Sequence, residues 1–297
     1  MSTKSDLSQY HHPVSELFPT VSAEDVERYR LSPEQVQFFH EYGYLSNIPL
    51  VDEAQVDKLI KELDEIKDPG HPRNNLFYEF HSNESADPNA VLFHSLGHWR
   101  ISPGFHDVLC NAPFVVAACQ LLGDRSVRFW HDQLFCKPAH HGGVVAWHQD
   151  YSYWTRTVPL QHLTCWVGLD DATRDNGCLY YIPGSHKWGL LDKPVLAGDM
   201  TGLLKDLSID QKNQFENKVP IEMKRGHATF HHPLMVHGSY ENKSERPRRA
   251  FVINVFADGT TSDSNDELLK GVPAIPRGER MQGRFFPLLY DAAKCKN

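Results

Sequence analysis

The sequence changes character at about Asp124, and this change limits the fold more than any other feature. Before it, apolar residues recur at helical spacing. After it come short runs rich in β-branched and aromatic residues, separated by Gly, Pro, Asn and Asp. Helices first and strands later, without alternation, predict an α+β plan in which helices pack outside a β-sandwich or barrel. We expect strands at residues 127–136, 144–154, 163–169, 179–182, 227–237 and 250–256.

Three helical segments are expected in the first part of the chain. The run Ser-Pro-Glu-Gln at residues 32–35 has the N-cap, the N1 proline and the third-position Gln of a capped helix, which would end at Gly43. Asp52 caps a second segment with apolar residues at a spacing of about 3.6. A third helical region covers residues 104–122. These helices therefore precede the strands rather than connect them.

The domain organisation follows from the same patterns. Residues 1–30 are polar and mixed, and we interpret them as an N-terminal arm. No internal repeat or composition boundary divides the rest, so we expect one domain over residues 31–297, with its β-core at about 125–258.

Composition excludes several classes of partner. The formal net charge is −8 and there is no long basic run, so we expect no nucleic-acid partner. No apolar stretch approaches the ~18 residues of a membrane-spanning helix, and the N-terminus lacks an apolar signal core. The six cysteines show no CxxC spacing, and those in apolar runs, such as Cys119 and Cys165, are expected to be buried free thiols. We therefore expect a cytoplasmic protein that acts on a small molecule.

Histidine is abundant, with 18 residues, and one pattern suggests a metal site. His148 and Asp150 lie in a strand-like run, where residues i and i+2 project to the same face. An imidazole and a carboxylate are two of the three ligands of the 2-His-1-carboxylate triad of non-haem Fe(II) enzymes. The His-x-Asp pattern alone is weak evidence for a metal site, since it occurs by chance in many proteins.

The third ligand has to come from the second histidine cluster, which offers more than one candidate. His237 is followed eleven residues later by Arg248, which the next strand could return to the same cavity. A guanidinium there suits a carboxylate of a dicarboxylic co-substrate through a bidentate pair. His227, His231 and His232 are the rival ligands.

The combined motifs resemble the phytanoyl-CoA dioxygenase family over residues 32–257. The motifs are His-Gln-Asp, a Trp eighteen residues after that His, Asp-Asn-Gly-Cys-Leu, Pro-Gly-Ser-His, and His-Gly-Ser with Arg eleven residues on. The resemblance implies a double-stranded β-helix, the cupin-like jelly roll, with N-terminal and flanking helices. It also implies a dioxygenase that uses Fe(II), 2-oxoglutarate and O2 and releases succinate and CO2.

The resemblance also implies roles for individual residues. The implied iron ligands are His148, Asp150 and His237. The implied 2-oxoglutarate neighbours are Arg248 at the distal carboxylate, Ser239 beside it, Trp166 and Gln133. The Lys that some members use has no clear match here, and His98 is one candidate to replace it. Family members that halogenate lack the carboxylate ligand, so the presence of Asp150 predicts hydroxylation of an aliphatic C–H bond.

Two other functions remain open on the sequence. A non-catalytic, cupin-like metal-binding or sensor protein would need no dicarboxylate clamp, whereas Arg248 and Ser239 are both present. A zinc hydrolase would be expected to carry a motif such as HExxH, which does not occur.

Clues to the substrate are fewer. Tyr151, Tyr153 and Trp154 follow the His-x-Asp pattern and are either an aromatic wall or ordinary core residues. Several cations could meet an anionic tail, or could be solvated surface: Lys137, Arg156, Arg174, Arg246 and Arg249.

Overall fold

Two facing antiparallel sheets form the centre of the computed structural model, which describes residues 5–85 and 87–295. The larger sheet has the order β1-β10-β7-β12-β4-β3-β2, with β14 also paired to β4. Its strands are β1 (Tyr44–Pro49), β2 (Glu79–His81), β3 (Phe93–Leu96), β4 (Val127–Lys137), β7 (His162–Gly168), β10 (His227–His231), β12 (Arg248–Ala257) and β14 (Leu288–Tyr290). The smaller sheet has the order β5-β11-β8-β9, comprising β5 (Val145–His148), β8 (Leu179–Tyr181), β9 (Val219–Ile221) and β11 (His237–Ser239). A separate pair joins β6 (Thr157–Val158) to β13 (Thr261–Ser262).

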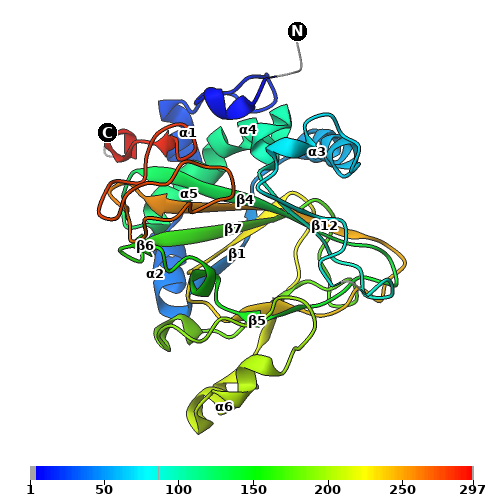
Figure 1. Cartoon of the computed structure of the whole chain (residues 1–297). Coiled ribbons are helices and arrows are strands. Elements are labelled where there is room, and N and C mark those ends of the chain that lie inside the picture. The colour runs from blue at the N-terminus through cyan, green and yellow to red at the C-terminus, as the bar shows by residue number, and fades with distance from the viewer. Residues whose placement is uncertain (1–4, 86, 296–297) are drawn as a thin grey trace.

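Helices cover the outer face of the larger sheet, while α6 projects beyond the smaller sheet at the opposite end (Figure 1). The helices are α1 (Ala23–Arg28), α2 (Pro33–Tyr42), α3 (Glu53–Ile66), α4 (Pro103–Asp107), α5 (Ala112–Leu121) and α6 (Ile209–Phe215). Short 3₁₀ turns connect them: η1 (Leu7–Gln9), η2 (Asn74–Leu76), η3 (His98–Arg100), η4 (Val108–Cys110), η5 (Asp150–Tyr153), η6 (Ser185–Lys187), η7 (Gly202–Lys205) and η8 (Ala292–Cys295). Both the α+β plan and the double-stranded β-helix are confirmed.

Successive side chains along the central strands alternate between two layers of the core. On β7, Cys165 and Val167 belong to the large cluster beneath the helices, whereas Trp166 belongs to the cluster between the two sheets. On β12, Phe251 and Val252 divide in the same way. Because successive strand side chains point to opposite faces, each central strand both anchors the helical layer and lines the space between the sheets.

The first two predicted helices have the expected ends. Ser32 and Gln35 form a capping box at the start of α2, and Gly43 ends this helix with a φ of 82°. Asp52 and Gln55 form the corresponding box at the start of α3. The third helical region, expected over residues 104–122, is present as three consecutive pieces, α4, η4 and α5. Pro113 stands in the first turn of α5, where a missing N–H is tolerated, and so begins a new helix.

Two of the predicted strands are shorter than expected. The run 144–154 is a strand only up to His148, because its pairing partner β11 is short, and the chain then enters η5. The run 227–237 divides into β10 and β11, which belong to different sheets. Pro233 lies between them and cannot donate a ladder hydrogen bond, so the strand cannot continue through it.

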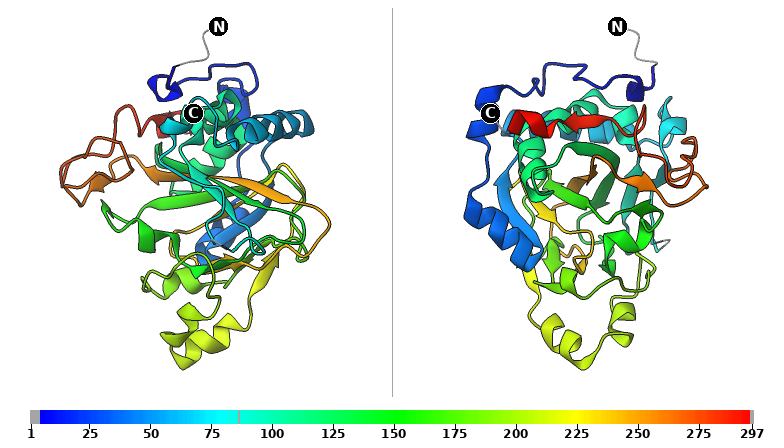
Figure 2. Two further views of the ribbon diagram at one scale, coloured as in Figure 1. Left: turned by 45° about the vertical axis from the view of Figure 1, so that its right-hand side comes forward. Right: turned by 90° about the vertical axis from the view of Figure 1, so that its left-hand side faces the viewer.

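The N-terminal arm packs on the helical side of the molecule. Phe18 is completely buried in the large core cluster. Asp6 pairs with Arg100 at 2.5 Å and with Arg284 near the other end of the chain at 2.6 Å. Figure 2 shows the first described residues crossing over the helical layer, close to the C-terminal segment. The arm is thus a packed part of the fold.

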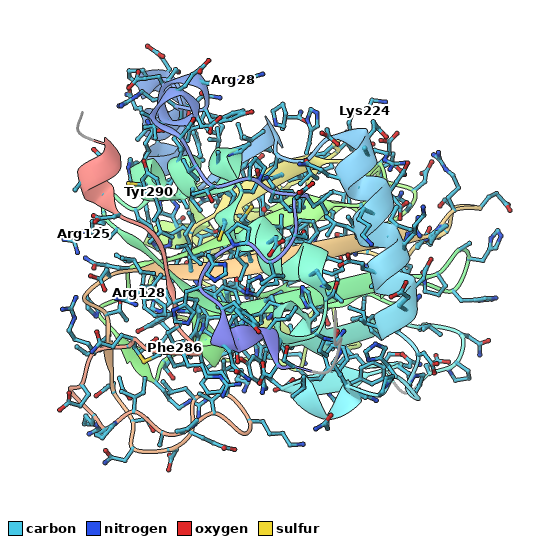
Figure 3. All side chains as sticks on the ribbon, turned by 90° about the horizontal axis from the view of Figure 1, so that it is seen from above. Arg28, Arg125, Arg128, Lys224, Phe286 and Tyr290 are labelled. Carbon is cyan, nitrogen blue, oxygen red and sulfur yellow. The ribbon has the colours of Figure 1, made fainter. Side chains whose placement is uncertain are left out.

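The C-terminal segment closes the same side of the larger sheet. Arg128 on β4 donates a hydrogen bond to the carbonyl oxygen of Phe286 at 3.0 Å and also pairs with Asp258. Seen from the helical side, Arg128 and Phe286 lie along this segment, which continues to Tyr290 (Figure 3). Because β14 pairs with β4, the segment is joined directly to the sheet.

Candidate metal and co-substrate site

Three side chains converge in the space between the two sheets. His148 ends β5, His237 begins the neighbouring β11, and the two are register partners. Asp150 begins η5, two residues beyond the strand. Its Oδ1 lies 3.4 Å from Nε2 of His148 and 3.6 Å from Nε2 of His237. One possible ligand atom from each residue therefore faces a common point, and the three atoms are close enough together to hold one metal ion.

Asp150 reaches this position by a route that the sequence pattern did not predict. The expectation that His148 and Asp150 share one face of a strand is wrong, because the strand ends between them. Gln149 is buried and donates hydrogen bonds to the carbonyl oxygens of Gly189 and Leu234, both at 2.9 Å. These bonds hold Gln149 away from the site, so the turn rather than strand alternation aims the carboxylate.

Backbone hydrogen bonds select the ligating nitrogen of both histidines. Nδ1 of His148 lies 2.7 Å from the carbonyl oxygen of Ala146, and Nδ1 of His237 lies 2.9 Å from that of Met235. A carbonyl oxygen only accepts hydrogen bonds, so both Nδ1 atoms carry the proton. The lone pair of each neutral ring is then on Nε2, the atom that faces Asp150, and this arrangement fits a metal ion.

The second oxygen of Asp150 is held by protein groups. Thr164 donates its hydroxyl hydrogen to Oδ2 at 2.6 Å, and Nε2 of His231 lies 2.9 Å from the same oxygen. Nδ1 of His231 is in turn 2.9 Å from the hydroxyl of Tyr181. Oδ1 then faces the two Nε2 atoms, so this carboxylate oxygen is held in a fixed orientation toward the metal position.

The protonation states suit a metal site. Burial alone would raise the pKa of Asp150, but the facing imidazoles of His237, His148 and His231 outweigh it and keep this pKa well below its usual value. Burial, followed by the neighbouring His148, keeps the pKa of His237 well below its usual value. The carboxylate is therefore ionised and His237 is neutral at physiological pH.

A buried cation lies at the other end of the same cavity. Arg248 begins β12, is 1% exposed and forms no ion pair with any described carboxylate. Burial lowers its pKa to about 10, so it stays charged at neutral pH. Two of its nitrogens, Nε and Nη1, have no hydrogen-bond partner among the described residues. An uncompensated, buried guanidinium is a strong reason to expect an anionic ligand.

The seven residues to which the resemblance assigned metal or co-substrate roles all line this one cavity. Trp166 on β7 and Gln133 on β4 come from the two strands that flank β12 in the larger sheet. The guanidinium of Arg248 lies over the indole of Trp166, 5.5 Å from the ring centroid. The Oγ of Ser239 lies 3.5 Å from Nη2 of Arg248. The other three are His148, Asp150 and His237.

Two of the three rival histidines have other contacts, and the third, His227, lines neither cavity. Among the described residues, the metal-competent group contains only His148, Asp150 and His237. His231 supports Asp150, and Nδ1 of His232 accepts the backbone N–H of Leu234 at 3.1 Å. Sequence analysis missed the supporting contacts of His231 and Thr164, since no pattern shows which oxygen of Asp150 they meet.

A second cavity of about 220 Å³ adjoins the first. Gln133, Phe135, His148 and Asp150 line both of them. No described residue before Glu79 lines either cavity, so the described part of the N-terminal arm, residues 5–30, does not line the site.

Aromatic and basic side chains form part of the remaining wall of the second cavity. Tyr153 and Trp154 line it, whereas the hydroxyl of Tyr151 donates to the carbonyl oxygen of Thr157 at 2.6 Å and Tyr151 packs in the core. Arg156 also lines it. The aromatic-wall interpretation thus applies to two of the three residues.

His98 is not a co-substrate neighbour. It is fully buried outside both cavities, with Nε2 3.1 Å from Oδ2 of Asp132. The nearby His94 lines the second cavity instead. Of the basic residues considered, Arg174 and Arg249 pair with Glu222 and Asp170.

The fold and the site together define a class of protein. A jelly roll that holds two histidines and a carboxylate between its sheets, next to a buried arginine, is typical of cupin-like, 2-oxoglutarate-dependent oxygenases. The sequence profile of the phytanoyl-CoA dioxygenase family matches residues 39–250. The chain belongs to the phytanoyl-CoA dioxygenase family and is an enzyme of the non-haem iron, 2-oxoglutarate-dependent dioxygenase type.

Individual relatives agree with this assignment. A phytanoyl-CoA dioxygenase of Arabidopsis thaliana is 31% identical over 263 residues, covering 77% of this chain and 90% of the relative. The phytanoyl-CoA dioxygenase domain-containing protein 1 of Bos taurus is 36% identical over 159 residues, covering 52% of this chain and 50% of its own.

Solved structures share the fold at low sequence identity. The α-ketoglutarate-dependent carbocyclase SnoK from nogalamycin biosynthesis superposes with a TM-score of 0.68 at 20% identity, covering 90% of this chain and 98% of its own. EctD from S. alaskensis, solved with 2-oxoglutarate and 5-hydroxyectoine, superposes with a TM-score of 0.64 at 20% identity, covering 84% of each chain.

Proposed function

We propose that this dioxygenase hydroxylates an aliphatic C–H bond of a compact small molecule, with His148, Asp150 and His237 as the Fe(II) ligands. The observation that carries the proposal is the convergence of two Nε2 atoms and Oδ1 of Asp150, each oriented by a hydrogen bond on its other polar atom. Such outer hydrogen bonds fix ligand orientation in metal sites. When bound, Fe(II) supplies the dioxygen activation that couples conversion of 2-oxoglutarate into succinate and CO2 to substrate hydroxylation.

Arg248 and Ser239 would hold the distal carboxylate of 2-oxoglutarate. Arg248 supplies a charge that no described side chain neutralises, and Ser239 supplies a hydroxyl 3.5 Å from it. Trp166 and Gln133 would line the rest of the co-substrate's path toward the metal. Because the guanidinium is buried, its attraction for a carboxylate is little screened by water.

The second cavity would receive the substrate. It shares His148 and Asp150 with the first, so a molecule in it lies beside the metal position. Its volume of about 220 Å³ lies below the ~300–1,000 Å³ typical of sites for drug-sized ligands. This favours a compact substrate with apolar surface to place against Tyr153 and Trp154.

The cellular setting is part of the proposal. Five of the six cysteines have described side chains, and all five are free. Four of these are buried: Cys119, Cys136, Cys165 and Cys178. In the part of the chain that the structure describes, no helix has the length and apolar character to cross a bilayer. Unpaired thiols support a reducing compartment, the cytoplasm.

A metal-binding sensor or a zinc hydrolase would use the same three ligands. Neither needs the buried, unpaired Arg248 at the far end of the cavity. This residue therefore favours the dicarboxylate-dependent enzyme over both alternatives.

An anaerobic titration tests the proposal directly. Adding Fe(II) and then 2-oxoglutarate to the wild-type protein should produce the visible charge-transfer band of a chelated keto acid. Asp150→Ala should abolish Fe(II) binding and succinate formation, while Arg248→Met should retain Fe(II) but lose 2-oxoglutarate. A folded wild-type protein that binds Fe(II) without the band would overturn the assignment, as would full activity of Asp150→Ala. Screening small molecules for coupled succinate release then identifies the substrate.

A further inference from the structure

A bulge in β4 brings two neighbouring ring side chains to the second cavity. Asn254 of β12 pairs with His131 of β4. The next residue of β12, Val255, pairs with Phe129, so Trp130 is an extra residue in β4. Adjacent side chains of a regular strand point to opposite faces, whereas a bulge can turn one of them back. Trp130 and His131 accordingly line the same cavity.

This pair of rings lies away from the co-substrate end of the site. Gln133 and Phe135 on β4 line both cavities, whereas Trp130 and His131 line only the second. Arg248 pairs with the last residue of β4, at the other end of the strand. The two rings are therefore placed to contact the substrate rather than 2-oxoglutarate.

The indole of Trp130 has a buried N–H group without a partner. Trp130 is 2% exposed, and its ring is stacked on that of Phe286 with the centroids 5.6 Å apart. Among the described residues, none accepts a hydrogen bond from its Nε1. An indole N–H only donates, and leaving it buried and unpaired is unfavourable. An acceptor oxygen in the cavity would remove this penalty.

The rings beside this N–H are uncharged. The ring centroid of His131 lies 5.3 Å from that of Trp130, and Trp154 packs edge-on against His131, also at 5.3 Å. Burial lowers the pKa of His131 to about 3, so its imidazole is neutral at physiological pH. A carboxylate bound among these rings would lose its hydration without gaining an opposite charge from them.

Arg156, a cation that also lines the cavity, holds part of the protein. Its guanidinium donates to the carbonyl oxygens of Glu267 at 2.7 Å and of Leu268 at 3.0 Å. These bonds fix the loop that brings Leu268 and Leu269 to the cavity. Arg156 thus adds apolar side chains to the wall.

We propose that Nε1 of Trp130 donates a hydrogen bond to an uncharged oxygen of the substrate, which is therefore a compact, mainly apolar molecule with a hydroxyl or carbonyl group. The inference rests on the proposed hydroxylase function. A pure hydrocarbon would leave the N–H unpaired, and a carboxylate would be buried among uncharged rings. Trp130 is thus a specificity-determining residue at a distance from the co-substrate.

Calorimetric titration of the anaerobic protein, loaded with Fe(II) and 2-oxoglutarate, tests this preference without relying on turnover. The probes are cyclopentanol and cyclopentanone, compared with cyclopentane and cyclopentanecarboxylate, which share their skeleton. The wild type should bind the alcohol and the ketone at least about fivefold more tightly than the other two, as expected for one uncharged hydrogen bond.

Trp130→Phe keeps an aromatic ring and removes the N–H. It should bind the alcohol and the ketone about three- to tenfold more weakly and leave the Kd for cyclopentane unchanged. Trp130→His, which keeps a ring N–H, should be intermediate. Trp188→Phe is the matched control, because this indole donates to Gln214 at 3.0 Å and lines neither cavity, and it should bind every probe like the wild type.

NMR spectroscopy of the metal-free protein, with ¹⁵N-labelled tryptophan, observes the donor directly. Trp130→Phe identifies the Nε1–H signal of this residue among those of the six tryptophans. That signal should move when cyclopentanol is added and should move much less with cyclopentane.

Each outcome bears on one proposition. Equal affinity for the four probes, tighter binding of the carboxylate, wild-type affinities in Trp130→Phe, or an unmoved Nε1–H signal would overturn the role of Trp130. A wild type that binds Fe(II) but forms no charge-transfer band with 2-oxoglutarate would overturn the proposed function instead. If Trp130→Phe does not fold, Trp130→His and the four wild-type affinities decide the question.

Discussion

At the scale of single residues, the ligand geometry depends on groups that never touch the metal position. His231 and Thr164 occupy Oδ2 of Asp150, and backbone carbonyls occupy Nδ1 of both histidines. Each bond removes one alternative orientation of a ligand. The three donors are therefore fixed before a metal ion arrives, which reduces the entropy lost on binding.

His231→Ala should weaken Fe(II) binding by about 10–100-fold, the usual effect of losing an outer-shell partner. The carboxylate of Asp150 would then rotate more freely. Fluorescence- or calorimetry-monitored anaerobic Fe(II) titration measures the change.

His227→Ala, on the same strand but outside both cavities, is the control and should keep the wild-type affinity. An unchanged affinity in the His231 variant would show that Thr164 alone orients Asp150.

At the scale of elements, the N-terminal arm is held by two carboxylates, of which Asp107 is completely buried and Asp6 partly buried. Asp107 on α4 accepts the backbone N–H groups of Val14 and Ser15, both at 2.7 Å. Asp6 binds Arg100 on η3 and Arg284 near the C-terminus. These contacts join three distant segments, so the arm contributes to the stability of the helical layer.

Asp6→Asn should lower the free energy of unfolding by about 1–2 kcal/mol at pH 7. Burial alone would raise the pKa of Asp6, but hydrogen bonds from Arg100 and Ser8 outweigh it, so this pKa lies below its usual value. The carboxylate's contribution is then present above the unfolded-state pKa of about 4 and is lost as pH falls through the folded-state pKa. Urea unfolding at several pH values should show the wild type and variant converging in acid.

Glu27→Gln removes an exposed ion pair on the same arm and should change stability by less than about 0.5 kcal/mol at any pH. A gap between wild type and Asp6→Asn that persists undiminished in acid would show that packing, not charge, anchors the arm.

At the scale of the whole molecule, the site joins the two sheets. His148 and His237 belong to the smaller sheet, whereas Arg248 and Trp166 belong to the larger. Metal and co-substrate together would therefore contact both halves of the jelly roll. Ligands that bind only the folded state stabilise it by mass action.

Fe(II) with 2-oxoglutarate at about 100 times its Kd should add about 2.7 kcal/mol and raise Tm by about 5 °C. Differential scanning calorimetry under nitrogen measures this shift. Arg248→Met should show the shift from Fe(II) but none from 2-oxoglutarate. Equal shifts with succinate in place of 2-oxoglutarate would indicate general anion binding instead.

The sequence alone was sufficient for the class of fold, the capped helices α2 and α3, and the set of seven residues that meet in one cavity. Local rules explain the helices and strands, because capping boxes and strand periodicity act between residues close in the chain. The seven cavity residues followed instead from the resemblance of the combined motifs to a family. The spacing of the motifs then identified the family. The resemblance to that family, rather than residue order alone, singled out His237 from among its neighbouring histidines.

Only the tertiary structure decided how these residues act. It moved Asp150 from a strand into a turn, made His231 a support for that carboxylate, and buried Lys137 behind Ser239. Each of these results depends on pairing between β-strands far apart in the chain, such as β4 with β12 and β5 with β11. Burial and hydrogen-bond partners across sheets are set by this long-range register, which no local pattern specifies.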